Sequence, residues 1–483
     1  MKWSEKLHQG NCQILKLSLG SRLIIVFAAL LFGRNGFCQL NLNSTEVDEI
    51  IGRSAKFIVE LQSNENSEGG AYKGEWPAYM QMRKAFVLLG TRSLYYDSNA
   101  FTTLAIHNSL AESVLTDSTL NYLKPALNSA YECAQAFQSE GQYNFWRLLE
   151  PNRPDLLGDS ARVRRPSHFK LGSGFINNAA NVVNDADDTS AGELAEFYQF
   201  KMGLIESNPK SRNTYNQVYL NYTDTNRCNL HWFNFIKDGN RHYGAYLTWL
   251  GQEKCIGKRF YLPRILANNF IFFLPKSICY PEPGKPYIPY GANDLDAVVN
   301  CNVLLARSIK IADEGMSRSD SCAVAYITQK IKRKKWSTAG IYYPNRYAIH
   351  YFVSRAYRSG IKDLGEARNR CLSHLVKTQN SNGSYTGRNR VNQGDPVQNT
   401  VYAALALLNM ADPASQEHKA ALDQAMRYLL LSVNTDSQSR SYWNAGVYFS
   451  GGTVVRNNLF FQSESLTTAL VLEALVKYRA KYM

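Results

Sequence analysis

A step of glycine, any residue and tyrosine recurs six times along this chain, and the repeat constrains the fold more than any other feature. The steps lie at 70–72, 141–143, 244–246, 340–342, 383–385 and 446–448. In four of them a glutamine lies upstream, at the end of an amphipathic stretch: Gln62, Gln138, Gln329 and Gln379. A repeat of this kind indicates a structural unit that cannot bury its apolar face alone and must stack on its neighbours.

An amphipathic stretch precedes the steps and a more apolar stretch follows each of them. Before the first step, Val47, Ile50, Ile51 and Ile58 keep helical spacing. The apolar stretches begin near residues 98, 187, 294, 346, 398 and 463. Amphipathic helices that alternate with apolar ones favour an outer ring around a buried inner ring. We therefore predict an all-α fold, an α6/α6 toroid in one domain at 39–483. An open helical solenoid is the alternative, and the irregular spacing argues against it.

The repeated residues have a structural explanation. A glycine can end the outer helix in a left-handed turn, and an aromatic ring two residues later can cover the helix end. A glutamine can bond the backbone groups that the helix end leaves free. We expect these positions to stabilise the scaffold.

Residues 1–38 have the pattern of a removable signal peptide. Lysines and Arg22 precede the apolar run 23–32, and the small residues Gly36 and Cys38 follow it. We predict cleavage between Cys38 and Gln39 and export to the periplasm or the outside of the cell. A lipoprotein site at Cys38 is an alternative, but bulky Phe37 precedes it. An uncleaved anchor is another, but ten apolar residues are short for a membrane span.

The chain carries a formal charge of +14, which falls to about +10 when the signal peptide is removed. Such a bias suits an anionic polysaccharide, a phosphorylated substrate or peripheral contact with an acidic membrane. A scattered solubilising charge explains it equally well. No nucleic-acid-binding motif is present, so we expect no nucleic-acid partner.

The cysteine pattern predicts neither a metal site nor a cofactor. Seven cysteines remain after residue 38, without a CxxC or CxxH spacing. Most lie in apolar helical settings and are expected in the core. In an oxidising compartment one disulfide can form among Cys228, Cys255 and Cys279.

The polar residues at the starts of the apolar helices are the candidate site, because the inner helices of a toroid point these ends at one mouth of its cavity. One acid per helix is explained by capping and by the helix dipole. His107, His231, His242 and His350 are expected to be core or surface residues rather than ligands. The candidates are Asp97, Asn99, Asp185, Asp187, Asp188, Asp294, Asp296, Asn345, Arg346, Gln398, Asn399 and Glu464.

Segment 184–190 (NDADDTS) is the exception, because it holds three carboxylates within four residues. Carboxylates this close repel one another, so at least one should hold its proton unusually tightly. A general acid near neutral pH needs this property. A divalent-cation site and a cap with two solvated neighbours are the alternatives.

Segment 185–190 resembles the DxDDTA segment of squalene–hopene cyclases and the DxDD motif of class II terpene cyclases. Segment 379–385 is similar to a QW repeat of the same superfamily with tyrosine in place of tryptophan, and segment 463–469 is similar to the last inner helix. The resemblance implies a fold of the terpenoid cyclase/protein prenyltransferase superfamily.

In that family the middle aspartate protonates an alkene, its neighbours tune it, and aromatic rings stabilise carbocations. The resemblance therefore implies that Asp187 is the acid and that Asp185 and Asp188 are its partners. Tryptophan faces attract cations, so Trp146, Trp232 and Trp443 are candidate walls. The substrate would be a small isoprenoid.

Other classes of protein use related toroids, so the fold does not decide the chemistry. The chain has room for one toroid, where full hopene cyclases have two, and an exported cyclase is unusual. A glycan hydrolase would need two carboxylates about 6.5–9.5 Å apart if it inverts. A glycan lyase would use Arg346 and Tyr347, and a binding toroid would need no chemistry. The hydrolase pairs would join Asp187 or Asp188 to Asp294, Asp296 or Glu464.

The cavity distinguishes these classes. An aromatic, mostly apolar cavity favours a cyclase, whereas an open groove with polar and aromatic platforms favours a glycan enzyme. A filled centre favours a binding module.

Overall fold

The structure is a computed structural model that describes residues 43–67, 71–82, 94–150, 162–167, 180–229, 231, 234, 242–253, 255, 284–387, 395–451 and 459–483. Residues Ser44–Met483 form one compact unit. The predicted signal peptide, Gly70, Trp232 and Cys279 lie outside the described residues.

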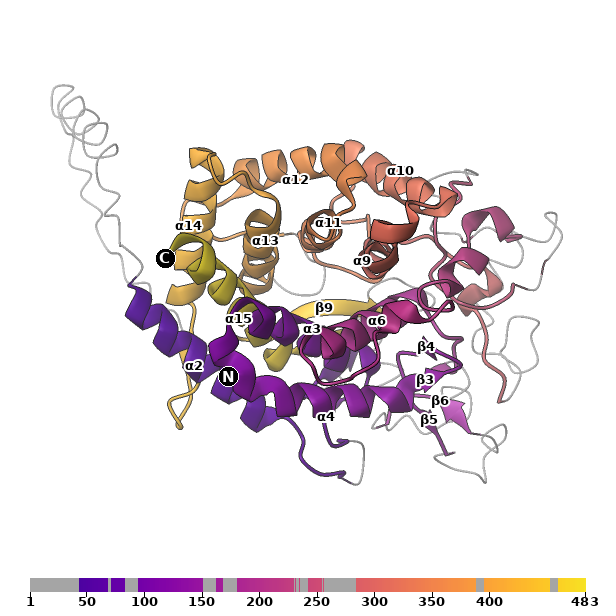
Figure 1. Cartoon of the computed structure of the whole chain (residues 1–483), viewed down its shortest axis with the longest axis horizontal. Coiled ribbons are helices and arrows are strands. Elements are labelled where there is room, and N and C mark those ends of the chain that lie inside the picture. The colour runs from indigo at the N-terminus through magenta and orange to yellow at the C-terminus, as the bar shows by residue number, and fades with distance from the viewer. Residues whose placement is uncertain are drawn as a thin grey trace, which may run out of the picture. The chain divides into compact units, whose positions relative to one another are not determined.

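The six expected apolar stretches all form helices, each starting within three residues of its predicted start. Each of these inner helices contacts the next in chain order, and the last contacts the first, so that they close a ring (Figure 1). Their apolar composition follows from this position, because neighbours cover them on several sides. They are α3 (Ala100–Thr116), α6 (Ala186–Lys201), α9 (Ala297–Glu314), α11 (Ala348–Arg358), α13 (Pro396–Met410) and α15 (Glu464–Tyr482).

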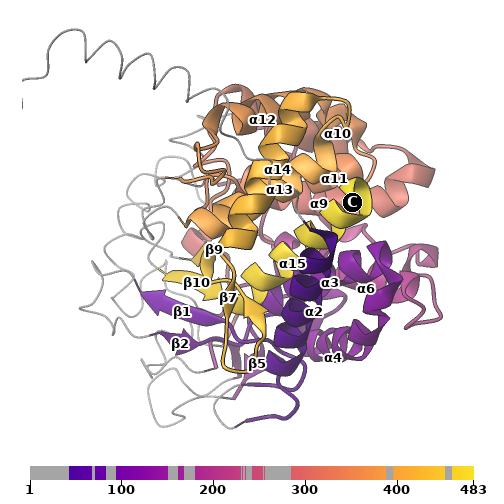
Figure 2. The same ribbon diagram turned by 90° about the vertical axis from the view of Figure 1, so that its left-hand side faces the viewer.

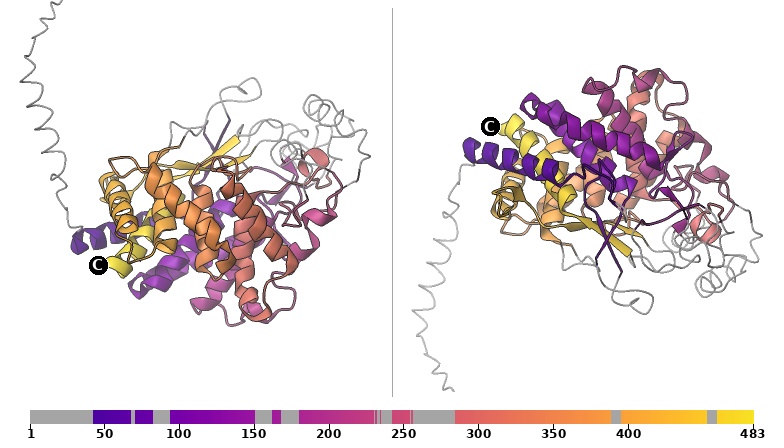
Figure 3. Two further views of the ribbon diagram at one scale, coloured as in Figure 1. Left: turned by 90° about the horizontal axis from the view of Figure 1, so that it is seen from above. Right: turned by 90° about the horizontal axis from the view of Figure 1, so that it is seen from below.

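The described residues form five outer helices, and each packs mainly on one inner helix. Helix α2 packs on α15, α4 on α3, α10 on α9, α12 on α11 and α14 on α13. Figure 3 shows the outer helices of the C-terminal half from above and α2 and α4 from below. The outer helices are α2 (Ser44–Leu61), α4 (Lys124–Ala134), α10 (Arg318–Lys332), α12 (Gly365–Thr378) and α14 (Gln416–Leu431).

No long outer helix is described between α6 and α9. The chain after α6 instead forms the short 3-10 helices η4 (Pro209–Ser211), η5 (Val218–Asn221) and η6 (Asp224–Asn226). This part of the chain is rich in Asn, Tyr and Thr and lacks an amphipathic period. The fold is therefore mostly helical, with an irregular segment at this point.

The expectation of an all-α fold needs a correction, because the structure contains strands. The four-stranded sheet has the order β2-β1-β10-β9, with β1 (Tyr79–Met82), β2 (Tyr95–Tyr96), β9 (Gly446–Gly451) and β10 (Leu459–Ser463). Figure 2 shows this sheet beside the inner helices. It joins the first repeat to the last, because closure of the ring brings their loops together and leaves their backbone groups to pair with each other. Three pairs of two-residue strands close other loops. They are β3 (Gln138–Ser139) with β4 (Gln142–Tyr143), β5 (Leu148–Leu149) with β6 (Val163–Arg164), and β7 (Asn434–Thr435) with β8 (Ser441–Tyr442).

Two of the repeated glutamines bond backbone groups, as expected, and they also reach the next outer helix. Gln62 donates from Nε2 to the carbonyls of Gly74 (2.9 Å) and Ala126 (2.8 Å). Gln379 donates to those of Gly383 (3.1 Å) and Ala421 (2.7 Å). Each glutamine therefore ties its own loop to the following repeat.

The first and last repeats use different aromatic residues from those that the Gly-x-Tyr pattern indicates. Trp76, two residues after Gly74, donates from Nε1 to the carbonyl of Ile58 in α2 at 2.8 Å. Trp443 makes the equivalent bond to the carbonyl of Leu429 in α14, also at 2.8 Å. Both indoles are fully buried and close the ends of outer helices.

A side chain in the first turns of the inner helices holds these loops in place. The backbone N–H of Tyr143 donates to Oγ1 of Thr189 at 2.9 Å, and that of Tyr385 donates to Oγ1 of Thr400 at 2.9 Å. In the third repeat Asn300 accepts from the N–H of Tyr246 at 3.0 Å. The backbone N–H of each of these tyrosines is thus bonded by the inner helix that follows it in the same repeat.

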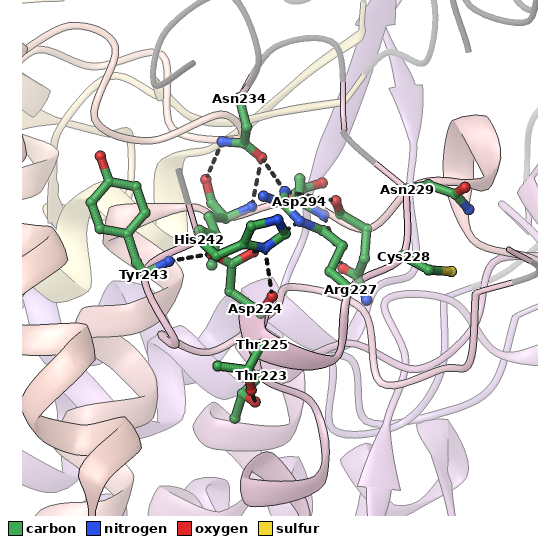
Figure 4. A network of polar contacts seen from close by, with 12 residues as sticks. Thr223, Asp224, Thr225, Arg227, Cys228, Asn229, Asn234, His242, Tyr243 and Asp294 are labelled. Carbon is green, nitrogen blue, oxygen red and sulfur yellow. Dashed lines mark hydrogen bonds and ion pairs between the residues drawn. The ribbon is translucent and has the colours of Figure 1, made fainter. Parts of the chain in front are cut away.

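A buried polar network organises the irregular segment after α6 (Figure 4). The Arg227 guanidinium pairs with Asp224 at 2.9 Å, and the backbone N–H of Tyr243 donates to the Asp224 carboxylate at 2.5 Å. Asn234 connects this segment to the start of α9 by donating to the carbonyl of Leu295 at 3.0 Å. The expected disulfide forms between Cys228 and Cys255.

Candidate active site

The acidic segment begins helix α6, and all three of its carboxylates are buried. Asp185 is the N-cap, and its Oδ1 accepts from the backbone N–H of Asp188 at 2.8 Å. This bond satisfies one of the N–H groups that a helix start leaves free. Capping therefore accounts for Asp185, and the other two aspartates need a separate explanation.

Asp187 lies in the first turn of α6 and contacts two polar side chains from other parts of the ring. Asn302 of α9 donates from Nδ2 to Oδ1 of Asp187 at 2.6 Å. The hydroxyl of Tyr343 donates to the other oxygen, Oδ2. Burial raises the pKa of Asp187 to about 7 against these two hydrogen bonds, which lower it, and the charges of Asp185 and Asp296 raise it further. The carboxyl therefore exchanges its proton near neutral pH.

Asp185 and Asp188 form a hydrogen-bonded pair beside Asp187. Burial raises the pKa of Asp185 to about 6, although bonds from Asp188 and from backbone groups lower it. Burial and the Asp185 charge raise the pKa of Asp188 well above its ordinary value. Oδ1 of Asp188 has no hydrogen-bond partner among the described residues. Burial and the adjacent Asp185 charge therefore favour the protonated form of Asp188.

A central cavity lies inside the ring of inner helices, and all six contribute to its wall. It is partly open to solvent. The wall is mostly apolar and aromatic, which suits a hydrocarbon ligand. It consists of Phe101, Ala105, Asn108, Ser190, Ala191, Leu194, Asn302, Leu305, Tyr351, Phe352, Arg355, Tyr402, Leu466 and Leu470.

Asp187 lies on the face of α6 that borders this cavity. Ser190, Ala191 and Leu194 follow it at three, four and seven residues, the spacing of one helical face. Asp187 does not itself border the open space. Its partner Asn302 does border it. The Asp187 carboxyl therefore lies at the end of the cavity where α6 begins, behind the residues that bond it.

An aromatic cluster surrounds the Tyr343 ring at this end of the cavity. The Tyr343 ring lies 5.0 Å from the Phe352 ring, 6.0 Å from that of Phe101 and 5.9 Å from that of Phe449 in β9. Phe449 in turn stacks on Phe145 at 5.1 Å. The sheet that closes the ring thus supplies aromatic residues to the acid end of the cavity.

The candidates at the start of α3 bond one another rather than the cavity. Asn99 is the N-cap of α3 and donates from Nδ2 to Asp97 at 2.9 Å. Trp146 donates from Nε1 to the other oxygen of Asp97 at 3.1 Å. Burial raises the pKa of Asp97 to about 7 against these two bonds. None of the three is among the residues that line the cavity.

The two acids before α9 are held by protein donors. Asp294 accepts from the hydroxyls of Thr248 at 2.5 Å and Tyr342 at 2.6 Å. Asp296 is the N-cap of α9 and accepts from the backbone N–H of Val298 at 2.7 Å. Burial raises the pKa of both, to about 6 for Asp296. Neither borders the cavity, and their bonds are those of a scaffold.

The remaining candidates are spread over several loops and helix ends. Asn345 accepts from the N–H of Tyr347 at 2.9 Å, and Arg346 contacts Nε2 of His374 at 2.9 Å. Trp443 closes α14, as described above. Glu464 begins α15, and burial raises its pKa. These residues also lie away from the cavity lining.

The histidines are placed as expected for structural residues. His107 is buried, and burial lowers its pKa to about 4. Burial lowers the pKa of His231 to about 3, and His350 is stacked on Trp336 with ring centres 4.7 Å apart. Among the described residues no group of three or more His, Cys, Asp or Glu side chains could hold a metal ion. No described helix is long and apolar enough to cross a membrane.

The residues that sequence reasoning missed are Asn302, Tyr343 and the cavity residue Arg355. Asn302 and Arg355 lie within apolar inner helices, where a polar residue is costly unless it has a partner or a ligand. Polar residues on the inward face of an inner helix are therefore the signal that could have found them. No such signal marks Tyr343, whose role depends on how its loop folds.

Comparison with solved structures identifies the fold. A variant of the type II terpene cyclase MstE from Scytonema, in complex with the substrate geranylgeranyl dihydroxybenzoate, aligns with a TM-score of 0.50 and 12% identity over 90% of this chain and 98% of that chain. A second variant, in complex with the product merosterolic acid A, aligns with a TM-score of 0.51 and 13% identity over 90% and 97% of the two chains.

The chain has a terpenoid cyclase-like fold. A protein from Actinoplanes also aligns, with a TM-score of 0.50 and 12% identity over 89% of this chain and 99% of that chain. No protein-family model matches the sequence. No curated protein matches it either. At these identities the likeness concerns the fold, and the chemistry has to be argued from the site.

Proposed function

We propose that this protein is a class II terpene cyclase-like enzyme in which Asp187 is the general acid. One observation carries the proposal: a carboxyl with a pKa near 7 lies at the end of an aromatic, mostly apolar cavity. Protonation of an alkene needs an acid that keeps its proton until the substrate is bound. It also needs a wall that does not react with a carbocation, and this site supplies both.

In the proposed reaction, the π electrons of the terminal alkene form a C–H bond with the Asp187 proton. The electrons of the broken O–H bond stay on the carboxylate, and a tertiary carbocation remains on the substrate. Neighbouring double bonds attack it in turn and form rings. Loss of a proton from the last cation gives a product with the mass of the substrate, so that the net reaction is an isomerisation.

The surrounding residues tune the acid and protect the cations. Burial, with a smaller contribution from the charge of Asp185, raises the pKa of Asp187, so the protonated acid is populated near neutral pH. The faces of Phe101, Tyr351, Phe352 and Tyr402 line the cavity and can stabilise positive charge through their π systems. Their apolar surfaces also keep water away from a reactive cation. No step requires a metal or an organic cofactor.

Several finer points belong to the same proposal. The helices are arranged as an α6/α6 toroid whose third outer position is irregular. The substrate is an isoprenoid, in keeping with the geranylgeranyl compound bound by MstE. Residues 1–38 direct the chain out of the cytoplasm and are removed. A glycan hydrolase or lyase has less support, because Asp294, Asp296 and Arg346 bond residues away from the cavity lining, whereas Asp187 bonds the lining residue Asn302.

The test uses the mature chain with prenyl alcohols, prenyl acids and geranylgeranyl dihydroxybenzoate, and detects products of unchanged mass by chromatography and mass spectrometry. Asp187→Asn should lower the turnover rate about 10²- to 10⁴-fold, as expected on loss of a general acid. Glu193→Gln is a matched control, because burial also raises the pKa of Glu193 to about 7 and it lies on the same helix. Its side chain contacts Tyr219 at 2.6 Å, outside the cavity lining. Full activity of Asp187→Asn would refute the proposed acid.

A further inference from the structure

The polar residues that border the central cavity differ in whether the protein satisfies them. Asn108 donates to the carbonyl of Ala191 at 3.0 Å, and Ser190 donates to that of Asp187 at 2.8 Å. Asn302 donates to the Asp187 carboxyl. Arg355 also borders the cavity, but it makes no hydrogen bond and no ion pair within 4.0 Å with any described residue. A guanidinium carries five donors and stays charged, so it has capacity that the protein does not use.

The acids nearest to Arg355 are already matched by other cations. Glu112 pairs with Lys477 at 3.0 Å and with Arg358 at 2.7 Å. Glu473 pairs with Lys477 at 2.5 Å and accepts from Ser109 Oγ at 2.8 Å. Although burial raises it, Lys477, Arg358, the Tyr198 hydroxyl and the more distant charge of Arg355 together hold the pKa of Glu112 well below its ordinary range. Both carboxylates therefore already pair with cations other than Arg355.

The charges of this cluster do not balance. Glu112 and Glu473 supply two negative charges, whereas Lys477, Arg358 and Arg355 supply three positive charges. Glu473 and Glu112 stabilise the Arg355 charge without a hydrogen bond or ion pair to it, and one positive charge of the cluster remains for a further anion to neutralise. Since Arg355 is the cation of the cluster that lines the cavity, the missing partner would lie inside the cavity.

The position of Arg355 orients such a ligand. Its Cζ lies 5.4 Å from the centre of the Tyr351 ring, which restrains the guanidinium from one side. Arg355 lies two turns after the start of α11, about 11 Å along the helix axis. Tyr343, which bonds Asp187, precedes α11. The charge and the acid thus lie toward opposite ends of the aromatic wall.

We infer that Arg355 binds the single anionic group of an amphipathic substrate, whose hydrocarbon part then extends along the cavity toward Asp187. The inference rests on the proposed function for the direction of the hydrocarbon chain, but the anion site itself can be tested without turnover. The excess of one positive charge favours a carboxylate over a diphosphate, because Glu112 and Glu473 would repel further negative charge.

The experiment measures binding of farnesoic acid, farnesol and farnesyl diphosphate to the mature chain by isothermal titration calorimetry. The acid and the alcohol share a hydrocarbon chain and differ in the head group. The wild-type protein should bind the acid about tenfold more tightly or better, the effect of one charge-assisted hydrogen bond. Arg355→Met should abolish this preference, whereas Arg355→Lys should keep part of it.

Arg358→Met is the matched control, because Arg358 is on the same helix and pairs with Glu112 outside the cavity lining. It should retain the preference for the acid, and circular dichroism checks that each variant is folded. Equal binding of acid and alcohol by the wild type, or no binding of the acid, would overturn the anion site. Tighter binding of the diphosphate would overturn the single-charge assignment. An active Asp187→Asn variant that still prefers the acid would refute the proposed function and leave this inference standing.

Discussion

The substitution Asp187→Asn should remove the proposed acid and at the same time stabilise the protein at alkaline pH. Asp187 accepts from Asn302 on one oxygen and from the Tyr343 hydroxyl on the other. An asparagine can keep both contacts, because its Oδ1 can accept from Asn302 and its Nδ2 can donate to the Tyr343 oxygen. It therefore has the shape of protonated Asp187 and cannot ionise.

The size of the effect follows from the pKa of Asp187, which burial raises from 3.8 to about 7. A raised carboxyl pKa means that the folded protein binds more protons than the unfolded chain between these two values. The stability of the wild type therefore falls as pH rises from about 4 to about 7 and is level above that. Three pKa units correspond to about 4 kcal/mol at pH 8. At pH 5 the stability difference between the variant and the wild type is about 1.5 kcal/mol, because most of the pH range between the two pKa values lies above pH 5.

Thermal or denaturant unfolding of both proteins from pH 4 to pH 8 measures this difference. With an unfolding entropy of about 2.1 cal/mol/K per residue, 4 kcal/mol corresponds to about 4 °C in Tm for a unit of this size. Glu193→Gln should also become more stable than the wild type as pH rises, by about 3 kcal/mol, because burial raises the pKa of Glu193 from 4.5 to about 7. A stability difference for Asp187→Asn that does not change with pH would refute the raised pKa, and a less stable variant at pH 8 would refute the geometry.

Two further predictions concern the hydroxyl beside the acid and the repeated glycine. Tyr343→Phe removes a hydrogen bond that lowers the pKa of Asp187, so the alkaline limb of the rate–pH profile should move to higher pH; no movement would contradict the contact. Gly383→Ala should lower the free energy of unfolding by about 2 kcal/mol or more, because φ is +85° and a Cβ would lie 2.2 Å from the Gln424 carbonyl oxygen. Gly52→Ala, where a Cβ meets nothing within 4 Å, is its control, and equal effects in urea unfolding would refute the explanation.

The helical ring was largely predictable from the sequence, because each repeat contains its own periodic apolar face. All six inner helices start within three residues of the expected positions, since the change from amphipathic to apolar composition is local. The sheet between the first and last repeats was not predicted. Strands β1 and β10 are about 380 residues apart and pair only after the ring has closed.

The candidate site was predictable only in part, for a related reason. Most of the expected binding residues, including Asp97, Asn99 and Asp296, bond the scaffold, because the residue types that cap helices are also those that bind ligands. Trp443 was expected in a cavity wall and instead closes the end of α14. Composition alone does not distinguish these roles.

The sequence by itself determined the repeat, the positions of the inner helices and the crowding of three carboxylates at the start of α6. These properties depend on residues that are close together in the chain. Only the tertiary structure decided which carboxyl lies beside the cavity, that Asn302 and Tyr343 bond it, and that Arg355 lines the cavity without a hydrogen bond to another described side chain. Burial and charge pairing depend on residues 115 to 364 positions apart, and these meet only when the ring closes.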